Sequence, residues 1–302
     1  MTNSQEKKLP PIRACLFDMD GLLIDSEELY TKIVNIILQE YGRPSLPWSV
    51  KAQLQGRPAP EAGKLFHDWA QLPIAMDEFL IKQTALQKQY FPTTQPLAGV
   101  PELLSTLIKT LTTATPVHIA LATSSMTSKF ELKTNHLREL FSLFPASQVV
   151  LGDDPRIGAG RGKPLPDIYL IALETINKNL REAGEVEITP EECLVFEDSV
   201  PGVESGRRAG MRVVWVPHVG LLNEYRGREE EVLAGLTGEH KELDGDNATV
   251  NKELPLLDGV EKGWRGVGSG SGMLGKLNDG WGELLPSLLN FPYERYGIQV
   301  PS

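Results

Sequence analysis

Two aspartates at the end of a short apolar segment are the first residues in the chain that could do chemistry. Asp18 and Asp20, followed by Gly21, come directly after the apolar run 12–17. Such a run predicts a buried parallel strand, and ligands of open α/β sheets bind beyond the carboxyl ends of the strands. Residues two apart on an extended segment point to the same side, so we expect both carboxylates to share one pocket beside a glycine turn.

An Asp-x-Asp-Gly sequence by itself has other interpretations. It is typical of an ordinary turn, because Asp and Gly are both turn residues. A calcium-binding loop would need Asp or Asn at the fifth position and Gly at the sixth, where this chain has Leu22 and Leu23. A metal-dependent glycosyltransferase is a third possibility. The choice among them therefore depends on which groups accompany the two aspartates.

Three further groups of polar residues stand at the ends of predicted strands or just before a predicted helix. They are Thr123 with Ser124, Lys163, and Glu197 with Asp198. Each group alone has an ordinary structural explanation, namely a helix start, a solvated loop charge and an N-cap. Because the carboxyl ends of parallel strands meet at one edge of a sheet, we expect the groups to converge on the aspartates.

The chemistry of these groups together fits phosphoryl transfer. Asp18 and Asp198 offer the oxygen ligands that Mg²⁺ prefers. A carboxylate can attack phosphorus and form an aspartyl-phosphate, while Lys163 and the Thr123 hydroxyl would neutralise and position the phosphate. Asp20 is placed to protonate the leaving oxygen and then to deprotonate a water molecule.

The elements that position these residues follow an alternating pattern. Helical and strand-like segments alternate over residues 11–24 and 96–221, which predicts a doubly wound parallel α/β sheet. No strand pattern appears over 25–95, where we expect an inserted all-α cap domain. Residues 222–285 are rich in Gly, Glu, Lys and Asp and predict a flexible insertion, whereas 286–298 is apolar enough to dock on the core.

Composition limits the partners that the chain can have. Its 302 residues carry a formal charge of −10, which disfavours nucleic acid and anionic membranes as partners. We find no apolar run long enough to cross a membrane and no secretory signal. Cys15 and Cys193 lie in apolar segments and predict buried free thiols in a reducing compartment. We therefore expect a cytoplasmic monomer that acts on a small molecule.

The four groups of polar residues resemble, in order, the four motifs of the haloacid-dehalogenase-like hydrolases, and the Asp-x-Asp-Gly form resembles the phosphatase branch. The resemblance covers residues 12–220. It implies a Rossmann-like core, the helical cap of the beta-phosphoglucomutase-like subgroup, and Mg²⁺ as cofactor. It also implies that Asp18 is the nucleophile and that Asp20 is the general acid and base and binds Mg²⁺ through its backbone carbonyl. Asp198 would supply a further ligand, with Glu197 at or near the metal.

Within this subgroup, the segments 122–125, 193–198 and 291–297 resemble the pseudouridine-5'-phosphatase branch. This implies a small phosphate ester such as pseudouridine 5'-phosphate, although relatives with the same core act on sugar and glycerol phosphates. A phosphosugar mutase that uses the same aspartyl-phosphate is one rival function. A non-catalytic protein that binds a partner through 222–285 is another, and the complete set of motifs argues against it.

Two other segments bear on phosphate binding. Arg57 lies in the cap segment 54–58, where relatives carry a substrate-recognition loop, and it is equally interpreted as a substrate contact or as a solvated charge. The glycine-rich segment 158–163 is not a P-loop, because Ile157 and Pro164 replace the required Gly and Ser or Thr. We interpret this segment as a loop that delivers a lysine to the site.

Overall fold

The computed structural model describes residues 9–55, 59–238, 274 and 276–301 of the chain. Within these residues a six-stranded parallel sheet has the strand order β3-β2-β1-β4-β5-β6. The strands are β1 (Ala14–Phe17), β2 (His118–Ala122), β3 (Val149–Val150), β4 (Cys193–Glu197), β5 (Arg212–Trp215) and β6 (Gly282–Leu284). The chain starts at the centre of the sheet and builds outward on both sides, which confirms the predicted doubly wound α/β fold.

Strand β1 shows why the sheet is buried on both faces. Its alternate residues Ala14 and Leu16 join the apolar core on one face, whereas Cys15 and Phe17 join the core on the other. The first face is covered by α8 (Asp167–Ala183), α9 (Val200–Arg208) and α11 (Glu229–Ala234), and the second by α5 (Val100–Thr110) and the C-terminal segment 285–298. Cys15 and Cys193 are buried free thiols, as predicted.

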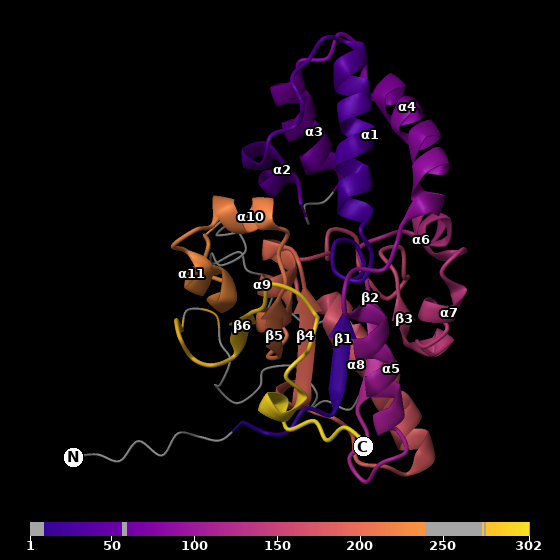
Figure 1. Ribbon diagram of the computed structural model, residues 1–302, viewed down its shortest axis with the longest axis vertical. Coiled ribbons are helices and arrows are strands. Elements are labelled where there is room, and N and C mark those ends of the chain that lie inside the picture. The colour runs from indigo at the N-terminus through magenta and orange to yellow at the C-terminus, as the bar shows by residue number, and fades with distance from the viewer. Residues whose placement is uncertain (1–8, 56–58, 239–273, 275, 302) are drawn as a thin grey trace, which may run out of the picture.

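Four helices stand beyond the carboxyl ends of the strands, at the top of Figure 1. They are α1 (Ser26–Glu40), α2 (Trp48–Leu54), α3 (Ala59–Ala70) and α4 (Met76–Tyr90). Their apolar faces pack into a cluster of their own, which includes Ile37, Leu38, Phe66 and Phe79. This cluster is separate from the two clusters on the sheet, so these helices have their own hydrophobic core.

The two connections between these helices and the sheet run side by side. The backbone N–H of Asp25 donates to the carbonyl of Gln95 at 3.0 Å, and the Gln95 N–H donates to the Asp25 carboxylate at 2.7 Å. A short bridge between Ile24 and Pro96 continues the pairing. Because the chain leaves and re-enters the sheet layer at one place, we propose that 25–95 is a cap domain hinged there.

The remaining helices connect the strands or flank them. Between β2 and β3 the chain forms two helices, α6 (Thr127–Thr134) and α7 (Arg138–Phe141). The others are α10 (Val219–Glu224) and the short 3₁₀ helices η1 (Phe91–Thr93), η2 (Ala146–Gln148), η3 (Pro190–Glu192) and η6 (Tyr293–Tyr296). No helix in the described part of the chain is long and apolar enough to span a membrane.

The expectation that 222–285 is a flexible insertion is wrong for the parts of this segment that the structure describes. Val232 and Leu233 of α11 are buried in the core, and β6 pairs in parallel with β5. Arg207, which is 2% exposed, forms a salt bridge with Asp279. The composition of 222–285 is mostly polar, and only a few of its residues make these contacts with the core. For this reason composition alone predicted a flexible segment. Residues 239–273 and 275 lie outside the described residues.

Candidate active site

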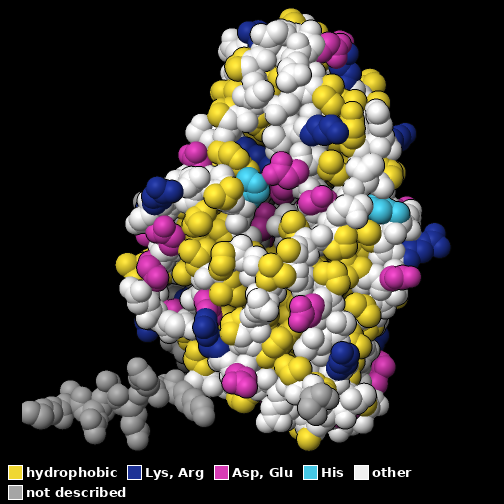
Figure 2. All heavy atoms as spheres, in the orientation of Figure 1, with side chains coloured by type: hydrophobic (Ala, Val, Ile, Leu, Met, Phe, Trp, Pro, Cys, Tyr) yellow, Lys and Arg dark blue, Asp and Glu magenta, His cyan; other side chains and the backbone are white. Residues whose placement is uncertain are grey.

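The predicted site residues meet at the carboxyl edge of the sheet, below the cap helices. Phe17 at the end of β1 is in register with Leu121 of β2 and Phe196 of β4, so the three strands end at the same level. Asp18 and Thr123 therefore emerge side by side and are buried. Figure 2 shows acidic side chains and a histidine at the waist of the molecule, between the cap helices and the sheet.

Lys163 is the cation at the centre of this edge. Its Nζ lies 2.5 Å from Asp18 Oδ1 and 2.6 Å from Glu197 Oε1, and it donates to the Ala122 carbonyl at 3.2 Å. Burial acts to lower the pKa of this ammonium, but the charges of Asp18 and Glu197 outweigh it and raise the pKa. Lys163 is therefore held as a buried cation, and the loop before α8 delivers it as the sequence predicts.

The carboxylates of this site outnumber its cation. Burial raises the pKa of Asp18 to about 7, with Lys163 opposing the rise and Glu197 and Asp20 adding to it. Burial also raises the pKa of Asp198 well above its usual range, and Asp18 and Glu197 raise it further. One ammonium does not compensate three buried carboxylates, so the arrangement calls for more positive charge.

The residues fit a metal ion as the source of that charge. Asp18, Glu197 and Asp198 each offer an oxygen, and these atoms all lie within 4.8 Å of one another. Gly21 makes room for the cluster, because a Cβ on it would lie 2.3 Å from Asp198 Oδ2. Gly202 likewise makes room for Glu197, because a Cβ on Gly202 would lie 2.0 Å from Glu197 Oε1. A buried set of oxygen donors alone is what a hard divalent cation requires, so these three residues could hold one.

Asp20 lies in a separate set of hydrogen bonds. One carboxylate oxygen accepts from Ser26 Oγ at 2.5 Å and the other from Ser125 Oγ at 2.6 Å. Lys133 Nζ lies 2.5 and 2.7 Å from the two oxygens. Burial acts to raise the pKa of Asp20, but the charge and hydrogen bonds of Lys133, with those of the two serines, lower it overall. The structure thus gives the two aspartates different cations.

The residues around Asp20 are the part of the site that sequence reasoning missed. Lys133 is fully buried on α6. Lys129 lies one turn earlier on the same helix, and nothing in the local sequence distinguishes the two lysines. The contact of Lys133 with Asp20 spans 113 positions of the chain, so only the tertiary fold reveals it.

The expected phosphate-binding residues have more limited contacts. Thr123 Oγ1 accepts a hydrogen bond from the Ser125 backbone N–H at 3.1 Å, which orders the loop after β2. Ser124 is exposed next to it. Arg57 lies outside the described residues. The roles of these three residues in substrate binding therefore stay predictions.

One residue of the cap helices does reach the site. Gln55 follows α2 directly and is buried, and its Nε2 donates to Asp198 Oδ2 at 3.1 Å. The helix before it is anchored on the sheet layer, where the Trp48 ring stacks on His218 with centroids 4.6 Å apart. These helices therefore contribute a polar group to the carboxylate cluster.

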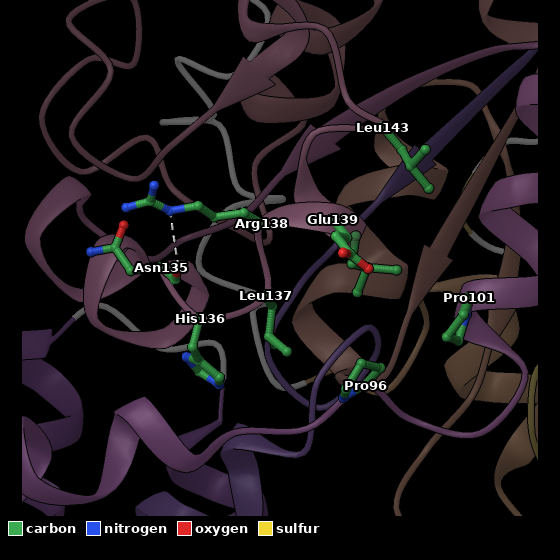
Figure 3. Close-up of a pocket in the computed structure, with 9 residues that line it drawn as sticks. Pro96, Pro101, Asn135, His136, Leu137, Arg138, Glu139 and Leu143 are labelled. Atoms are coloured by element: carbon green, nitrogen blue, oxygen red, sulfur yellow. Dashed lines mark hydrogen bonds between the residues drawn. The ribbon is translucent and has the colours of Figure 1, made fainter.

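A hollow of about 540 Å³ lies next to the second connection between cap and sheet. Figure 3 shows Pro96, His136 and Arg138 among the residues that line it. The Arg138 Nε donates a hydrogen bond to the Asn135 carbonyl at 3.1 Å. None of the buried carboxylates described above lines this hollow. The hollow is therefore distinct from the site at the sheet edge.

Comparison with known proteins decides the family. The family model described as haloacid dehalogenase-like hydrolase matches residues 15–216, which include all four groups of polar residues. The chain belongs to the haloacid dehalogenase-like hydrolase family. Asp18, Lys163 and Asp198 all lie within the residues that the family model matches. The structure brings the three together at the carboxyl edge of the sheet.

Similar members of the haloacid dehalogenase-like hydrolases include enzymes named as phosphatases. The chain is 46% identical over 225 residues to a probable pseudouridine-5'-phosphatase of Saccharomyces cerevisiae, covering 74% of this chain and 90% of that protein. It is 38% identical over 223 residues to (DL)-glycerol-3-phosphatase 1 of Arabidopsis thaliana, covering 73% and 69%. A solved structure provisionally assigned as a beta-phosphoglucomutase of Thermotoga maritima has a TM-score of 0.51 at 28% identity, covering 70% and 91%.

Proposed function

We propose that this hydrolase is a Mg²⁺-dependent phosphomonoesterase that acts through an aspartyl-phosphate on Asp18. The observation that carries the proposal is the environment of Asp18, whose buried carboxylate contacts Lys163 at 2.5 Å and faces Glu197 and Asp198. A carboxylate with a fixed cation beside it and further oxygen ligands around it is suited to attack a phosphate ester.

Each residue has a defined part in the proposed reaction. Asp18 Oδ1 contacts Lys163, so Oδ2 is the oxygen that attacks phosphorus. The bond from phosphorus to the ester oxygen breaks, and that oxygen takes a proton from Asp20, which must carry a proton at this step although Lys133 lowers its pKa. Water then attacks the phosphoryl group on Asp18 and gives a proton to Asp20, which releases phosphate and restores Asp18. Lys163 stabilises the charge on the transferring group throughout.

The residues around Asp18 would hold Mg²⁺ during this reaction. Asp18 and Asp198 are the proposed carboxylate ligands, with Glu197 at or near the ion and the Asp20 backbone carbonyl as a further ligand. When bound, the ion supplies positive charge that neutralises the carboxylates and the phosphate oxygens. Mg²⁺ suits the proposal because it takes few carboxylates and keeps several waters.

Chelation is expected to remove phosphatase activity, and added Mg²⁺ is expected to restore it. Ca²⁺ should inhibit, because its longer bonds and greater number of ligands would misplace the nucleophile. Since the pKa of Asp18 is raised to about 7 without metal, protons compete with the cation as the pH falls through this value, and Mg²⁺ affinity should fall with it. Phosphate release from p-nitrophenyl phosphate measures all three effects. Full turnover in excess chelator would refute the metal role.

The cap limits the substrate that we propose. Gln55 contacts Asp198 directly, so a cap residue lies beside the proposed metal ligands, and we expect the cap to cover the nucleophile when substrate is bound. A closed site suits a small leaving group and excludes water from the reacting phosphate. Relatives are named for pseudouridine 5'-phosphate and glycerol 3-phosphate, which are both small esters of hydroxylated alcohols. We propose a small phosphometabolite of this kind, with pseudouridine 5'-phosphate as the leading candidate, for a monomeric cytoplasmic enzyme.

Pseudouridine 5'-phosphate is expected to have a higher kcat/KM than uridine 5'-phosphate. The two esters carry the same phosphate and ribose, so any difference must arise from the base, which only the cap side is placed to contact. A panel of nucleoside, sugar and glycerol phosphates, followed by released phosphate, measures the preference. If pseudouridine 5'-phosphate is among the poorest substrates, this candidate fails while the phosphatase proposal stands.

A phosphosugar mutase is the second candidate, because the matched Thermotoga maritima structure is provisionally assigned as a beta-phosphoglucomutase. Such an enzyme would return the phosphoryl group of Asp18 to a sugar phosphate rather than to water. Product analysis separates the two functions. Free phosphate from glucose phosphates supports the phosphatase, and an isomeric sugar phosphate without phosphate release supports the mutase.

A further inference from the structure

Lys133 is a buried cation that belongs to none of the four motif groups. Its side chain is fully buried, and its Nζ lies 2.5 and 2.7 Å from the two carboxylate oxygens of Asp20. A buried ammonium is costly unless it is paired and hydrogen-bonded. The pair is therefore built into the fold, with α6 of the sheet layer supplying the cation.

Lys133 also sets the direction of a second hydrogen bond to Asp20. Its Nζ donates to Ser125 Oγ at 2.6 Å, and Ser125 Oγ lies 2.6 Å from Asp20 Oδ2. A hydroxyl has one proton, and this oxygen already accepts from an ammonium that has no lone pair to offer. The Ser125 proton must therefore point at Asp20. Removing the ammonium would loosen both contacts at once.

The lysine itself is held in place from several sides. Thr94, in the second connection between cap and sheet, donates its hydroxyl to the Lys133 carbonyl at 2.7 Å. The rings of Tyr30 and Phe91 each lie 5.4 Å from Nζ, within the range of a cation–π contact. Lys133 thus forms a fixed support rather than a mobile surface charge.

We propose that Lys133 is a positioning residue for Asp20, which holds both carboxylate oxygens where the proposed acid and base work requires them. The inference rests on the proposed phosphatase function and extends it to a residue outside the motifs. Lys133 is fully buried and its Nζ contacts Asp20 and Ser125, so it acts through Asp20 and should affect turnover and not substrate binding. Misplacing a catalytic group by about 1 Å costs on the order of 10²-fold in rate.

A double-mutant cycle between Asp20 and Lys133 tests this role. Lys133→Met keeps the length of the side chain and removes its charge. It should lower kcat for p-nitrophenyl phosphate by about 10²-fold and change KM by less than about twofold. In the Asp20→Asn background the same substitution should change kcat by less than about twofold, because the residue that it positions is already inactive.

Lys129→Met is the matched control, since Lys129 lies one turn earlier on α6 and interacts electrostatically with Asp20 without a hydrogen bond or salt bridge to it in the described structure. It should leave kcat within about twofold of the wild type. Lys133→Met leaves a buried carboxylate without its cation, so its fold needs a separate check. Asp20→Asn in turn leaves the buried Lys133 ammonium without its carboxylate, whereas the double variant lacks both charges, so circular dichroism is needed for all four proteins.

Additive losses in the cycle would overturn the role of Lys133, as would a large rise in KM with kcat unchanged. A wild-type protein that releases no phosphate from any ester would instead overturn the proposed function on which the role rests. Thermal unfolding distinguishes the two failures further. If the pair exists as described, the melting temperatures of the four proteins are non-additive whether or not they are active.

Discussion

Asp18→Asn is expected to leave no measurable phosphatase activity. An amide nitrogen or oxygen is a poor nucleophile towards phosphorus, and the amide is a weaker metal ligand than a carboxylate. Removing the nucleophile of a covalent mechanism costs on the order of 10⁴–10⁶-fold in kcat. Initial rates of phosphate release with saturating Mg²⁺ measure the loss.

The same variant should remain folded, which makes the loss interpretable. Burial raises the pKa of Asp18, so the folded protein disfavours its charge, and a neutral amide of the same shape removes that cost. Lys163 keeps Glu197 as a partner at 2.6 Å. Asp77→Asn, on the exposed first turn of α4, is a control for the substitution itself and should leave activity unchanged. Near-normal turnover by purified Asp18→Asn protein would sink the proposed mechanism.

Asp20→Asn is expected to lower kcat by about 10²–10⁴-fold, the usual contribution of general acid and base catalysis. The loss should be greater for glycerol 3-phosphate than for p-nitrophenyl phosphate, because an alkoxide needs a proton on leaving and a nitrophenolate does not. The asparagine Oδ1 can still accept from Ser26 and Lys133, but its NH₂ replaces the oxygen that accepts from Ser125, so circular dichroism of the variant accompanies the assay.

The size of the loss for each ester separates the two roles of Asp20. Water attack on the phosphorylated Asp18 needs a base with either substrate, so both esters should lose activity. An equal loss of kcat for the alkyl and the aryl ester would show that Asp20 acts only as a base and does not protonate the leaving oxygen. No loss for either would show that Asp20 takes no part in the chemistry.

The residues that sequence reasoning found share a physical property. Asp18, Thr123 and Asp198 each stand at the end of an apolar run, and parallel strands place such ends at one edge. Lys163 alone has the ordinary explanation of a solvated loop charge, and it is singled out because it stands just before a predicted helix and accompanies the other three groups. In the structure Lys163 contacts Asp18 as this interpretation requires.

Other features depend on contacts that the local sequence does not encode. Lys133 has the same local pattern as Lys129, and only the packing of α6 against Asp20 separates them. Strand β6 has three residues, including Gly282 and Glu283, so it lacks the apolar run that identified the other strands. It joins the sheet because β5 offers it an open edge, with Val213 paired to Gly282.

The central claim is that phosphate passes through Asp18, and acid-quench trapping of the protein during turnover tests it most directly. Wild-type protein mixed with substrate and Mg²⁺ is quenched in acid, digested, and analysed by mass spectrometry for a phosphorylated peptide. We predict one phosphoryl group on the peptide that contains Asp18, more of it in Asp20→Asn, which lacks the base for its hydrolysis, and none in Asp18→Asn. Phosphate release with no phosphorylated Asp18 at any quench time, or with the phosphoryl group on another residue, would contradict the account.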